Sequence, residues 1–335
     1  MAKQNEGEYW LGFDLGGTKM LGAIFDAEFK PVVRVRKKTK AFLGQKAGVE
    51  RICEVINEAL EEANLKTSQI AGIGIGVPGP LDLNRGVVLE TPNLGWKNLP
   101  LQASLEKEFK CSAVILNDVD AGVYGEYRFG SAKDARCVIG VFPGTGIGGG
   151  CVYEGTILRG KTSSCMEIGH MLVAPDGPLC GCGRYGCLEA VASRLAVSAA
   201  AAQAAHRGDA PHLMKEAGAD LMKIRSGALA DSVKNGDKVV EQLLRDAGRH
   251  MGLAVASLVN LLAPDVVVLG GGMVEEMPKL FVEEVKKAAK NRVMPSYENS
   301  FEVVAAALGD DSAAMGAAAW VQKAVLAGAS PPLFN

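Results

Sequence analysis

The chain has no segment suited to a membrane and no surface suited to nucleic acid. Its N-terminus, MAKQNEGEYW, lacks the apolar stretch of a signal peptide, and no window reaches about 18 uninterrupted apolar residues. Its 36 Lys and Arg are balanced by 38 Asp and Glu, and they form no dense basic cluster for a phosphate backbone. We therefore expect a cytoplasmic protein that has neither a membrane nor a nucleic acid as a partner.

Composition also excludes disorder and a disulfide framework. Hydrophobic residues make up 48% of the chain and charged residues 22%, which is unlike a disordered segment. The most basic run, Arg34 to Lys40, alternates with Val and Thr, so we interpret it as the solvated face of a strand. Most cysteines are scattered through apolar sequence and are expected to be buried thiols. These are Cys53, Cys111, Cys137, Cys151 and Cys165.

Glycine is the residue in excess, at 41 of 335 positions, whereas proline occurs only 14 times. No G-X-Y period accompanies the glycines, which excludes a collagen-like chain. Glycine is used where a backbone turns tightly or comes close to a ligand, so its positions indicate candidate sites. The length of the chain suggests about two domains.

The apolar pattern predicts an α/β protein. In the first 118 residues it indicates the order βββαβαβ, with strands at 9–17, 20–30, 31–38, 70–77 and 112–118 and helices at 49–65 and 101–109. The second part opens with paired strands at 137–144 and 148–155, and the segment 157–162 continues the meander. Helices follow at 188–206, 213–230, 238–262, 278–291 and 312–325, with strands at 265–272 and 301–308.

Three glycine patterns match nucleotide-binding fingerprints but lack the required context. Two G-x-G-x-x-G matches begin at Gly74 and Gly144, yet the residues after them are turn-like and β-like, whereas a dinucleotide fingerprint opens a helix. A P-loop pattern comprises Gly155, Gly160, Lys161 and Thr162, and no helical period follows it. We favour a strand turn with a solvated lysine there. A P-loop NTPase that works through Lys161 is the alternative.

The informative glycines lie at strand turns. In the segment 14–19, DLGGTK, an aspartate ends one strand and a Gly-Gly-Thr turn leads into the next, and the segment 143–150, PGTGIGGG, has the same design. Because glycine has no Cβ, such turns bring several N–H groups against a phosphate, and the threonine hydroxyl adds a donor. One such turn alone would be an ordinary β-turn. Two of them, with LGGG at 269–272, favour a nucleotide site.

A further cluster joins His170 with Cys180, Cys182 and Cys187. Three thiolates and one imidazole form a complete tetrahedral set for a structural zinc ion. The alternative is redox chemistry, but the C-x-C pair lacks the helix N-terminus that lowers a thiol pKa. We favour zinc, which would also fix the ring of His170 so that its other nitrogen is aimed at a ligand.

A polar pair, Asn117 and Asp118, follows the apolar strand SAVIL directly before a helix. In an open α/β sheet, ligands bind beyond the carboxyl ends of the strands. The simpler interpretation is that Asp118 caps the helix and Asn117 turns the chain. Beside two phosphate turns, however, an aspartate that accepts a hydroxyl proton is what phosphoryl transfer to an alcohol requires.

Six motifs, in the order DLGGTK, TPNLGW, LNDVDA, GTGIGGG, EIGH and CGCGRYGCLE, resemble the ROK family of bacterial sugar kinases, above all its glucokinases. The resemblance covers nearly the whole chain, from about residue 9 to residue 325. It implies an α/β, actin-like and hexokinase-like (ribonuclease H-like) fold in which two domains close on a central cleft. It also implies a homodimer or dimer-based oligomer. We expect a small domain, 1–118, joined by the C-terminal helix 312–335, and a large domain, 119–311, with the zinc loop.

The resemblance also implies roles for individual residues. Asp118 would be the general base that takes the proton from the sugar 6-hydroxyl, and Asp14 would face Mg²⁺ and its waters. The sugar-binding residues of the family match Asn117, Glu167, His170 and Glu189, with Gly79 and Asn93 nearby. The ATP-binding residues match Asp14, Gly16, Gly17, Thr18 and Lys19, then Gly144, Thr145 and Gly146, and finally Gly271 at the adenosine. Structural zinc on His170, Cys180, Cys182 and Cys187 agrees with the family too.

The expected function is therefore ATP-dependent phosphorylation of a hexose, first of all of glucose to glucose 6-phosphate. The same polar side chains would also read mannose, N-acetylmannosamine, fructose or allose, and those sugars stay open as substrates. A sugar-binding regulator without chemistry is the other alternative. The family includes repressors with an N-terminal DNA-binding helix-turn-helix, and the roughly eight residues before the first strand leave no room for one.

Overall fold

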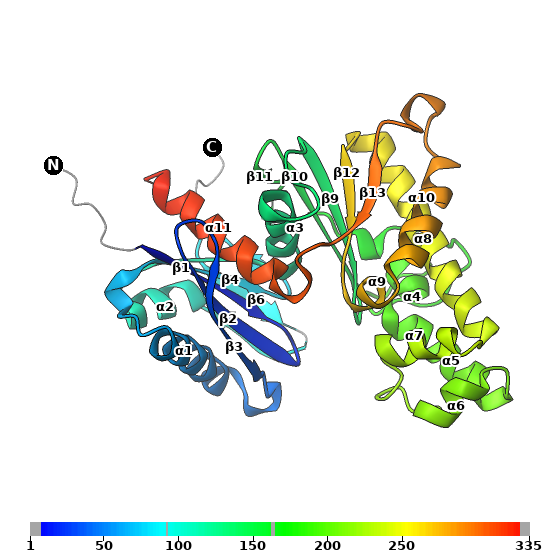
Figure 1. Ribbon diagram of the computed structural model, residues 1–335, viewed down its shortest axis with the longest axis horizontal. Coiled ribbons are helices and arrows are strands. Elements are labelled where there is room, and N and C mark those ends of the chain that lie inside the picture. Colours follow the sequence, from blue (N-terminus) through cyan, green and yellow to red (C-terminus); the bar gives the residue numbers. More distant parts are fainter. Residues whose placement is uncertain (1–7, 92, 162–164, 329–335) are drawn as a thin grey trace. The chain divides into compact units, whose positions relative to one another are not determined.

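The computed structural model describes residues 8–91, 93–161 and 165–328, which divide into two compact units (Figure 1). Unit 1 comprises residues 1–133, 157–165 and 310–335, and unit 2 comprises 134–156 and 166–309. We expected a boundary at 118/119. The observed division keeps helix α3 (Asp118–Phe129) in unit 1, because α3 packs along the C-terminal helix α11 (Ser312–Leu326). The last residues of the expected helix 312–335, from 329 on, lie outside the described residues.

Unit 1 is built on a five-stranded mixed sheet in the order β3-β2-β1-β4-β8. Strand β1 pairs antiparallel with β2 and parallel with β4, and β4 pairs parallel with β8. The strands are β1 (Tyr9–Leu15), β2 (Lys19–Phe25), β3 (Pro31–Lys38), β4 (Ile70–Val77) and β8 (Ser112–Asn117). Helices α1 (Gln45–Glu62) and α2 (Leu101–Phe109) cover one face, and α3 and α11 cover the other (Figure 1). The parallel strands β1, β4 and β8 therefore end at one edge of the sheet.

Helix α11 lies unusually close to this sheet because the strands beneath it carry glycine. A methyl group at Gly12 of β1 would overlap the carbonyl group of Ala314, and one at Gly74 of β4 would overlap that of Ala317. Part of the glycine excess therefore serves helix–sheet packing rather than a ligand.

A small antiparallel sheet in unit 1 was missed by the apolar pattern. Its strands are β5 (Leu81–Asp82), β6 (Val87–Thr91) and β7 (Trp96–Leu99), in the order β5-β6-β7. Two prolines and several turn residues in this stretch hide the short strands, each of which has four buried residues or fewer. The fully buried Trp96 anchors the sheet on the core of unit 1.

Unit 2 contains a second five-stranded sheet, in the order β11-β10-β9-β12-β13. Its strands are β9 (Cys137–Pro143), β10 (Ile147–Tyr153), β11 (Thr156–Ile157), β12 (Val266–Leu269) and β13 (Glu302–Ala305). The helices are α4 (Leu188–Ala192), α5 (Arg194–Arg207), α6 (Pro211–Ala217), α7 (Ser226–Lys234), α8 (Lys238–Leu262), α9 (Gly272–Glu276) and α10 (Pro278–Lys290). The long α8 packs against α10, and both contribute to the apolar core over the sheet.

Two helices of unit 2 that were expected to be continuous are broken. The segment 188–206 is interrupted at Ser193, whose hydroxyl accepts a hydrogen bond from the N–H of Ala196 and so caps α5. The segment 213–230 is interrupted because α6 ends at Gly218, which has a positive φ of 62°. Among the described residues, no helix is both long and apolar enough to cross a membrane.

Candidate active site

The first phosphate turn, Gly16–Lys19, joins β1 to β2 at the edge where the parallel strands of unit 1 end. It is held from below by Thr39, which is only 1% exposed. The hydroxyl of Thr39 donates to the carbonyl oxygen of Gly16 at 2.7 Å, and its backbone N–H donates to that of Thr18 at 2.9 Å. Sequence reasoning missed Thr39. The one available signal was a threonine at the end of the strand that pairs with Lys19.

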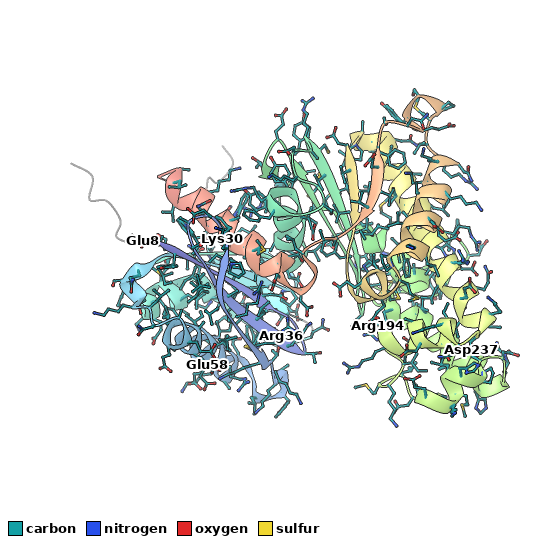
Figure 2. All side chains as sticks on the ribbon, viewed as in Figure 1. Glu8, Lys30, Arg36, Glu58, Arg194 and Asp237 are labelled. Carbon is teal, nitrogen blue, oxygen red and sulfur yellow. The ribbon has the colours of Figure 1, made fainter. Side chains whose placement is uncertain are left out.

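Lys19 of this turn is paired with Asp310, the first residue of unit 1 after the chain leaves unit 2. Its Nζ lies 2.7 Å from Oδ1 of Asp310, and a guanidinium nitrogen of Arg36, labelled in Figure 2, lies 3.0 Å from Oδ2. Lys19 and Arg36 lower the pKa of Asp310. The guanidinium of Arg34 holds both carboxylate oxygens of Asp311. The run from Arg34 to Lys38 is the exposed face of strand β3, as expected, and two of its arginines form ion pairs there with Asp310 and Asp311.

Two carboxylates meet at this edge, Asp14 on β1 and Asp118 at the start of α3. Strand β4 lies between them, with Gly76 directly opposite Asp14. A Cβ atom at Gly76 would lie 3.2 Å from the Cα of Asp118. Burial and the neighbouring charge of Asp118 raise the pKa of Asp14 to about 7, although Lys19 and Arg36 pull it down. Burial also raises the pKa of Asp118.

Asn117 rather than Asp118 supplies the main cap of α3. Its side-chain oxygen accepts hydrogen bonds from the N–H groups of Val119, at 2.9 Å, and Asp120, at 3.2 Å. Oδ1 of Asp118 also accepts from the Val119 N–H, at 3.0 Å. The side chain of Asn117 also hydrogen-bonds the carboxylate of Asp118, and this bond opposes the rise that burial causes in the pKa of Asp118. Helix capping and a catalytic role for Asp118 are compatible, because the cap uses only Oδ1 of Asn117 and Oδ1 of Asp118.

The other two expected sugar-side residues of unit 1 lie in the β4–β7 region. Asn93, in the turn before β7, lies against the first phosphate turn, since a Cβ atom at Gly17 would be 3.5 Å from the Cβ of Asn93. Gly79 has a φ of +95°, and a methyl group there would overlap the carbonyl oxygen of Glu90. The positive φ and the close packing therefore both favour glycine at this position.

The second phosphate turn, Gly144–Gly146, joins β9 to β10 in unit 2. The turn is closed by a hydrogen bond from the N–H of Gly144 to the carbonyl oxygen of Gly146, at 2.8 Å. Gly271, which has a φ of +80°, lies next to it, because a Cβ there would be 2.6 Å from the carbonyl oxygen of Pro143. Unit 2 thus brings together the second phosphate turn and the expected adenosine glycine.

Glu189 links this turn to the cysteine cluster. Its Oε2 accepts a hydrogen bond from the backbone N–H of Ile147 at 3.0 Å, and its Oε1 lies 3.8 Å from Sγ of Cys180. A methyl group at Gly146 would overlap the same carboxylate. One oxygen of Glu189 therefore accepts from the backbone of β10, and the other accepts from the thiol of Cys180.

Glu167 and His170 are exposed at the two ends of a short 3₁₀ turn, Ile168–His170. This turn packs tightly on β10: methyl groups at Gly149 and Gly169 would overlap Ile168 and the carbonyl oxygen of Ile147, respectively. The run of glycines at 148–150 was assigned to the phosphate turn in the sequence. In the structure these residues belong to β10, and Gly149 makes room for the turn that carries Glu167 and His170.

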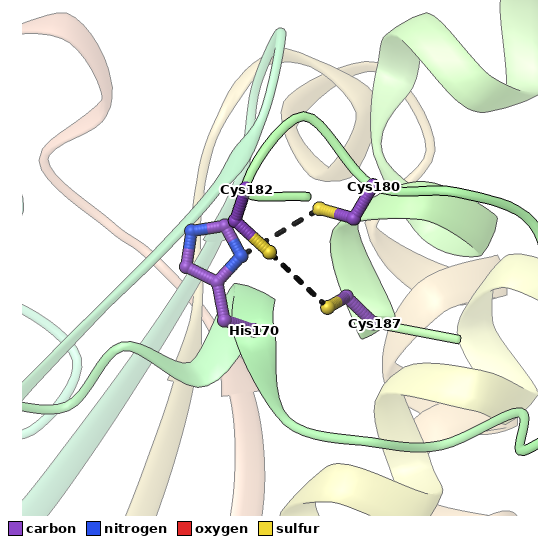
Figure 3. Close-up of side chains that lie close together, drawn as sticks. All are labelled: His170, Cys180, Cys182 and Cys187. Atoms are coloured by element: carbon purple, nitrogen blue, oxygen red, sulfur yellow. Dashed lines mark hydrogen bonds between the residues drawn. The ribbon is translucent and has the colours of Figure 1, made fainter. Parts of the chain in front are cut away.

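The predicted zinc ligands form a compact group (Figure 3). The ligand atoms of His170, Cys180, Cys182 and Cys187 all lie within 4.8 Å of one another. Nδ1 of His170 is 3.7 Å from Sγ of Cys180, and the sulfurs of Cys182 and Cys187 are 3.7 Å apart. A tetrahedral zinc ion with the usual bond lengths would hold two sulfurs about 3.8 Å apart and a sulfur and a nitrogen about 3.6 Å apart. The residues therefore fit a structural zinc ion, and Nε2 of His170 stays outside the cluster.

The three competing glycine patterns lack the helix that a dinucleotide fingerprint or a P-loop requires. The match that begins at Gly74 runs from β4 into a turn, and the one at Gly144 runs into β10, so neither opens a helix. In the P-loop pattern, Gly155 turns the chain between β10 and β11, and the described residues up to Lys161 form no helix. Thr162 lies outside the described residues.

The two five-stranded sheets and their helices form an actin-like, hexokinase-like α/β fold. The chain belongs to the ROK family, whose model matches residues 10–324. It is 31% identical to a glucokinase of Thermotoga maritima over 94% of this chain and 98% of that protein. It is 32% identical to a putative xylose repressor of a Caldicellulosiruptor species over 85% of this chain and 71% of that protein. A ROK family glucokinase from Streptomyces griseus, solved with glucose and AMPPNP, superposes with a TM-score of 0.81 at 30% identity, over 93% of this chain and 98% of that one.

Proposed function

We propose that the protein transfers the terminal phosphoryl group of ATP to the 6-hydroxyl of a hexose, with glucose as the first candidate. The observation that carries this proposal is the meeting of the first phosphate turn with Asp118 at one edge of the unit 1 sheet. Kinases of this kind need a phosphate site and a base for the alcohol side by side. The glucokinases of Thermotoga maritima and Streptomyces griseus support the choice of sugar and donor.

Asp118 would act as the general base. Its Oδ1 is held by the N–H of Val119, so Oδ2 would accept the proton of the sugar 6-hydroxyl. The freed oxygen would then attack the terminal phosphorus as the bond to ADP breaks, which leaves glucose 6-phosphate, ADP and a protonated Asp118. Burial raises the pKa of Asp118, and a more basic carboxylate is a better proton acceptor.

The neighbouring carboxylates of Asp14 and Asp118 suit a divalent cation. Each is an oxygen ligand of the kind that Mg²⁺ prefers, and their mutual repulsion is part of what raises the pKa of Asp14. When bound with ATP, Mg²⁺ would offset charge on the phosphates. Asp14 would face it, while the N–H groups of Gly16–Lys19 and Gly144–Gly146 would hold phosphate oxygens.

The sugar hydroxyls would be read by polar side chains. In unit 1 these are Asn93 and Asn117, and in unit 2 they are Glu167, His170 and Glu189. Structural zinc on the cysteine cluster would hold His170 and the loop before Glu189 in place. Zinc would do no chemistry, because four protein ligands leave no open position.

The test is an ADP-release assay with a panel of hexoses, in which the proposal predicts turnover with ATP and the largest kcat/KM for glucose. Mannose, N-acetylmannosamine, fructose and allose are the competing substrates. A repressor-like regulator is the second candidate, because a putative xylose repressor is 32% identical over 85% of the chain. If the protein binds a sugar but releases no ADP from ATP with any hexose of the panel, the result would favour the regulator and contradict the kinase.

A further inference from the structure

Arg194, the first residue of α5, makes two contacts with the second phosphate turn (Figure 2 labels it). One of its Nη2 hydrogens is donated to Oγ1 of Thr145 at 2.8 Å. Its backbone N–H donates to the carbonyl oxygen of Gly144 at 3.0 Å. No sequence motif had singled out Arg194, although both of its partners, Gly144 and Thr145, belong to the predicted turn.

The bond to Thr145 determines what the threonine hydroxyl can do. A hydroxyl has one hydrogen to donate, and its oxygen here already accepts from Arg194. The hydroxyl hydrogen of the exposed Thr145 is therefore available to an acceptor on the open side of the turn. The guanidinium has five N–H donors, and Thr145 uses one of them, so most of the fork is also free for an anion.

A second arginine lies in the same region of unit 2. Arg225 precedes α7, and the next residue, Ser226, is adjacent to the expected adenosine turn, since a Cβ at Gly272 would be 3.1 Å from its hydroxyl. The positive charge of Arg225 lowers the pKa of Arg194, after burial, which lowers it most. Neither guanidinium forms an ion pair with a carboxylate among the described residues. The partly buried Arg194 and the exposed Arg225 are thus two neighbouring cations without a carboxylate partner, an arrangement that favours an anionic ligand.

We propose that Arg194, supported by Arg225, binds the phosphate chain of the phosphoryl donor and orients the hydroxyl of Thr145 toward it. This inference rests on the proposed function for the identity of the donor. Arg194 would add a charged clamp to a turn that otherwise offers N–H groups and one hydroxyl. Its contribution grows with the number of phosphates, because a nucleotide monophosphate carries less charge and reaches less far than a triphosphate.

The experiment is calorimetric titration of the full-length protein with AMPPNP and, separately, with AMP, both with Mg²⁺. Loss of one charge-assisted hydrogen bond costs about a factor of ten or more in affinity. Arg194→Gln should therefore raise the Kd for AMPPNP about tenfold and change the Kd for AMP less than about twofold. Arg194→Lys keeps the charge but loses the forked guanidinium, so its Kd for AMPPNP should lie between those of the wild type and of Arg194→Gln. Arg207→Gln, on the same helix but paired with Asp209, is the matched control and should bind like the wild type.

The outcomes separate this inference from the kinase proposal. Equal loss of AMP and AMPPNP binding, with a lower melting temperature, would mean that Arg194 only braces the turn, and would overturn the inference. Unchanged AMPPNP binding in Arg194→Gln would overturn it as well. AMPPNP binding needs no hexose, so a selective loss would uphold the inference even if no sugar were phosphorylated. A wild-type protein that binds neither nucleotide would contradict both proposals.

Discussion

Asp14 and Asp118 stand at the carboxyl ends of neighbouring elements of one sheet, with Gly76 of β4 between them. Their proximity is visible in the pKa of Asp14, which burial and the charge of Asp118 raise to about 7. A side chain at Gly76 would crowd the start of α3, so glycine there lets the two carboxylates share a small volume.

The first prediction concerns stability and pH. An aspartate whose pKa is raised on folding binds its proton more tightly in the folded state, so its ionisation costs stability as pH rises from about 4 to about 7. Asp14→Asn should therefore be more stable than the wild type above pH 7, by roughly 1–2 kcal/mol after solvent screening, and no more stable near pH 4. Thermal unfolding of both proteins at several pH values measures this. A difference that does not change with pH would contradict the raised pKa.

The second prediction concerns the buried threonine beneath the first phosphate turn. Thr39→Val keeps the shape of the side chain but removes the hydroxyl that donates to the Gly16 carbonyl. The free energy of unfolding should fall by about 1–2 kcal/mol, and the KM for ATP should rise several-fold while the KM for the sugar changes little. Thr39→Ser retains the hydroxyl and is the matched control. Equal kinetics in the two variants would show that the bond does not position the turn.

The third prediction concerns metal. Elemental analysis should find about one zinc per chain, and a strong chelator should lower the melting temperature, because a structural ion adds its binding energy to folding. Cys182→Ser should lose the zinc and weaken sugar binding, since His170 would no longer be fixed. Cys53→Ser, at a cysteine outside the cluster, is the control and should keep both. A metal-free wild type of full stability would contradict a structural role.

Much of the fold follows from local pattern. The helix expected at 238–262 and the strand expected at 70–77 match the observed bounds of α8 and β4. Long or fully buried elements such as these have the clearest apolar pattern. The breaks at Ser193 and Gly218 were missed, although serine as a helix cap and glycine as a helix end are recognisable signals. The small sheet β5-β6-β7 was missed because its strands are too short to show alternation.

The site was predictable where a residue acts through its own chemistry and not where it acts through a partner distant in sequence. The cysteine cluster and the two glycine turns that join β1 to β2 and β9 to β10 could be predicted from spacing and glycine content, and the binding of phosphate by those turns stays a prediction. Thr39 and Arg194 could not, because their partners lie 23 and 49 residues away and only the fold brings them together. The same holds for Asp310, whose partner Lys19 is 291 residues away.

The most direct test of the whole account is the rate of ATP-dependent glucose phosphorylation by the wild type and by Asp118→Asn, with glucose binding measured on both. The account predicts that the wild type turns over and that the variant loses about 100- to 10,000-fold in kcat, since asparagine cannot accept the hydroxyl proton. The Kd for glucose should change only slightly, because the cap of α3 by Asn117 is intact. An Asp118→Asn variant with a near-normal kcat would contradict the assignment of the base.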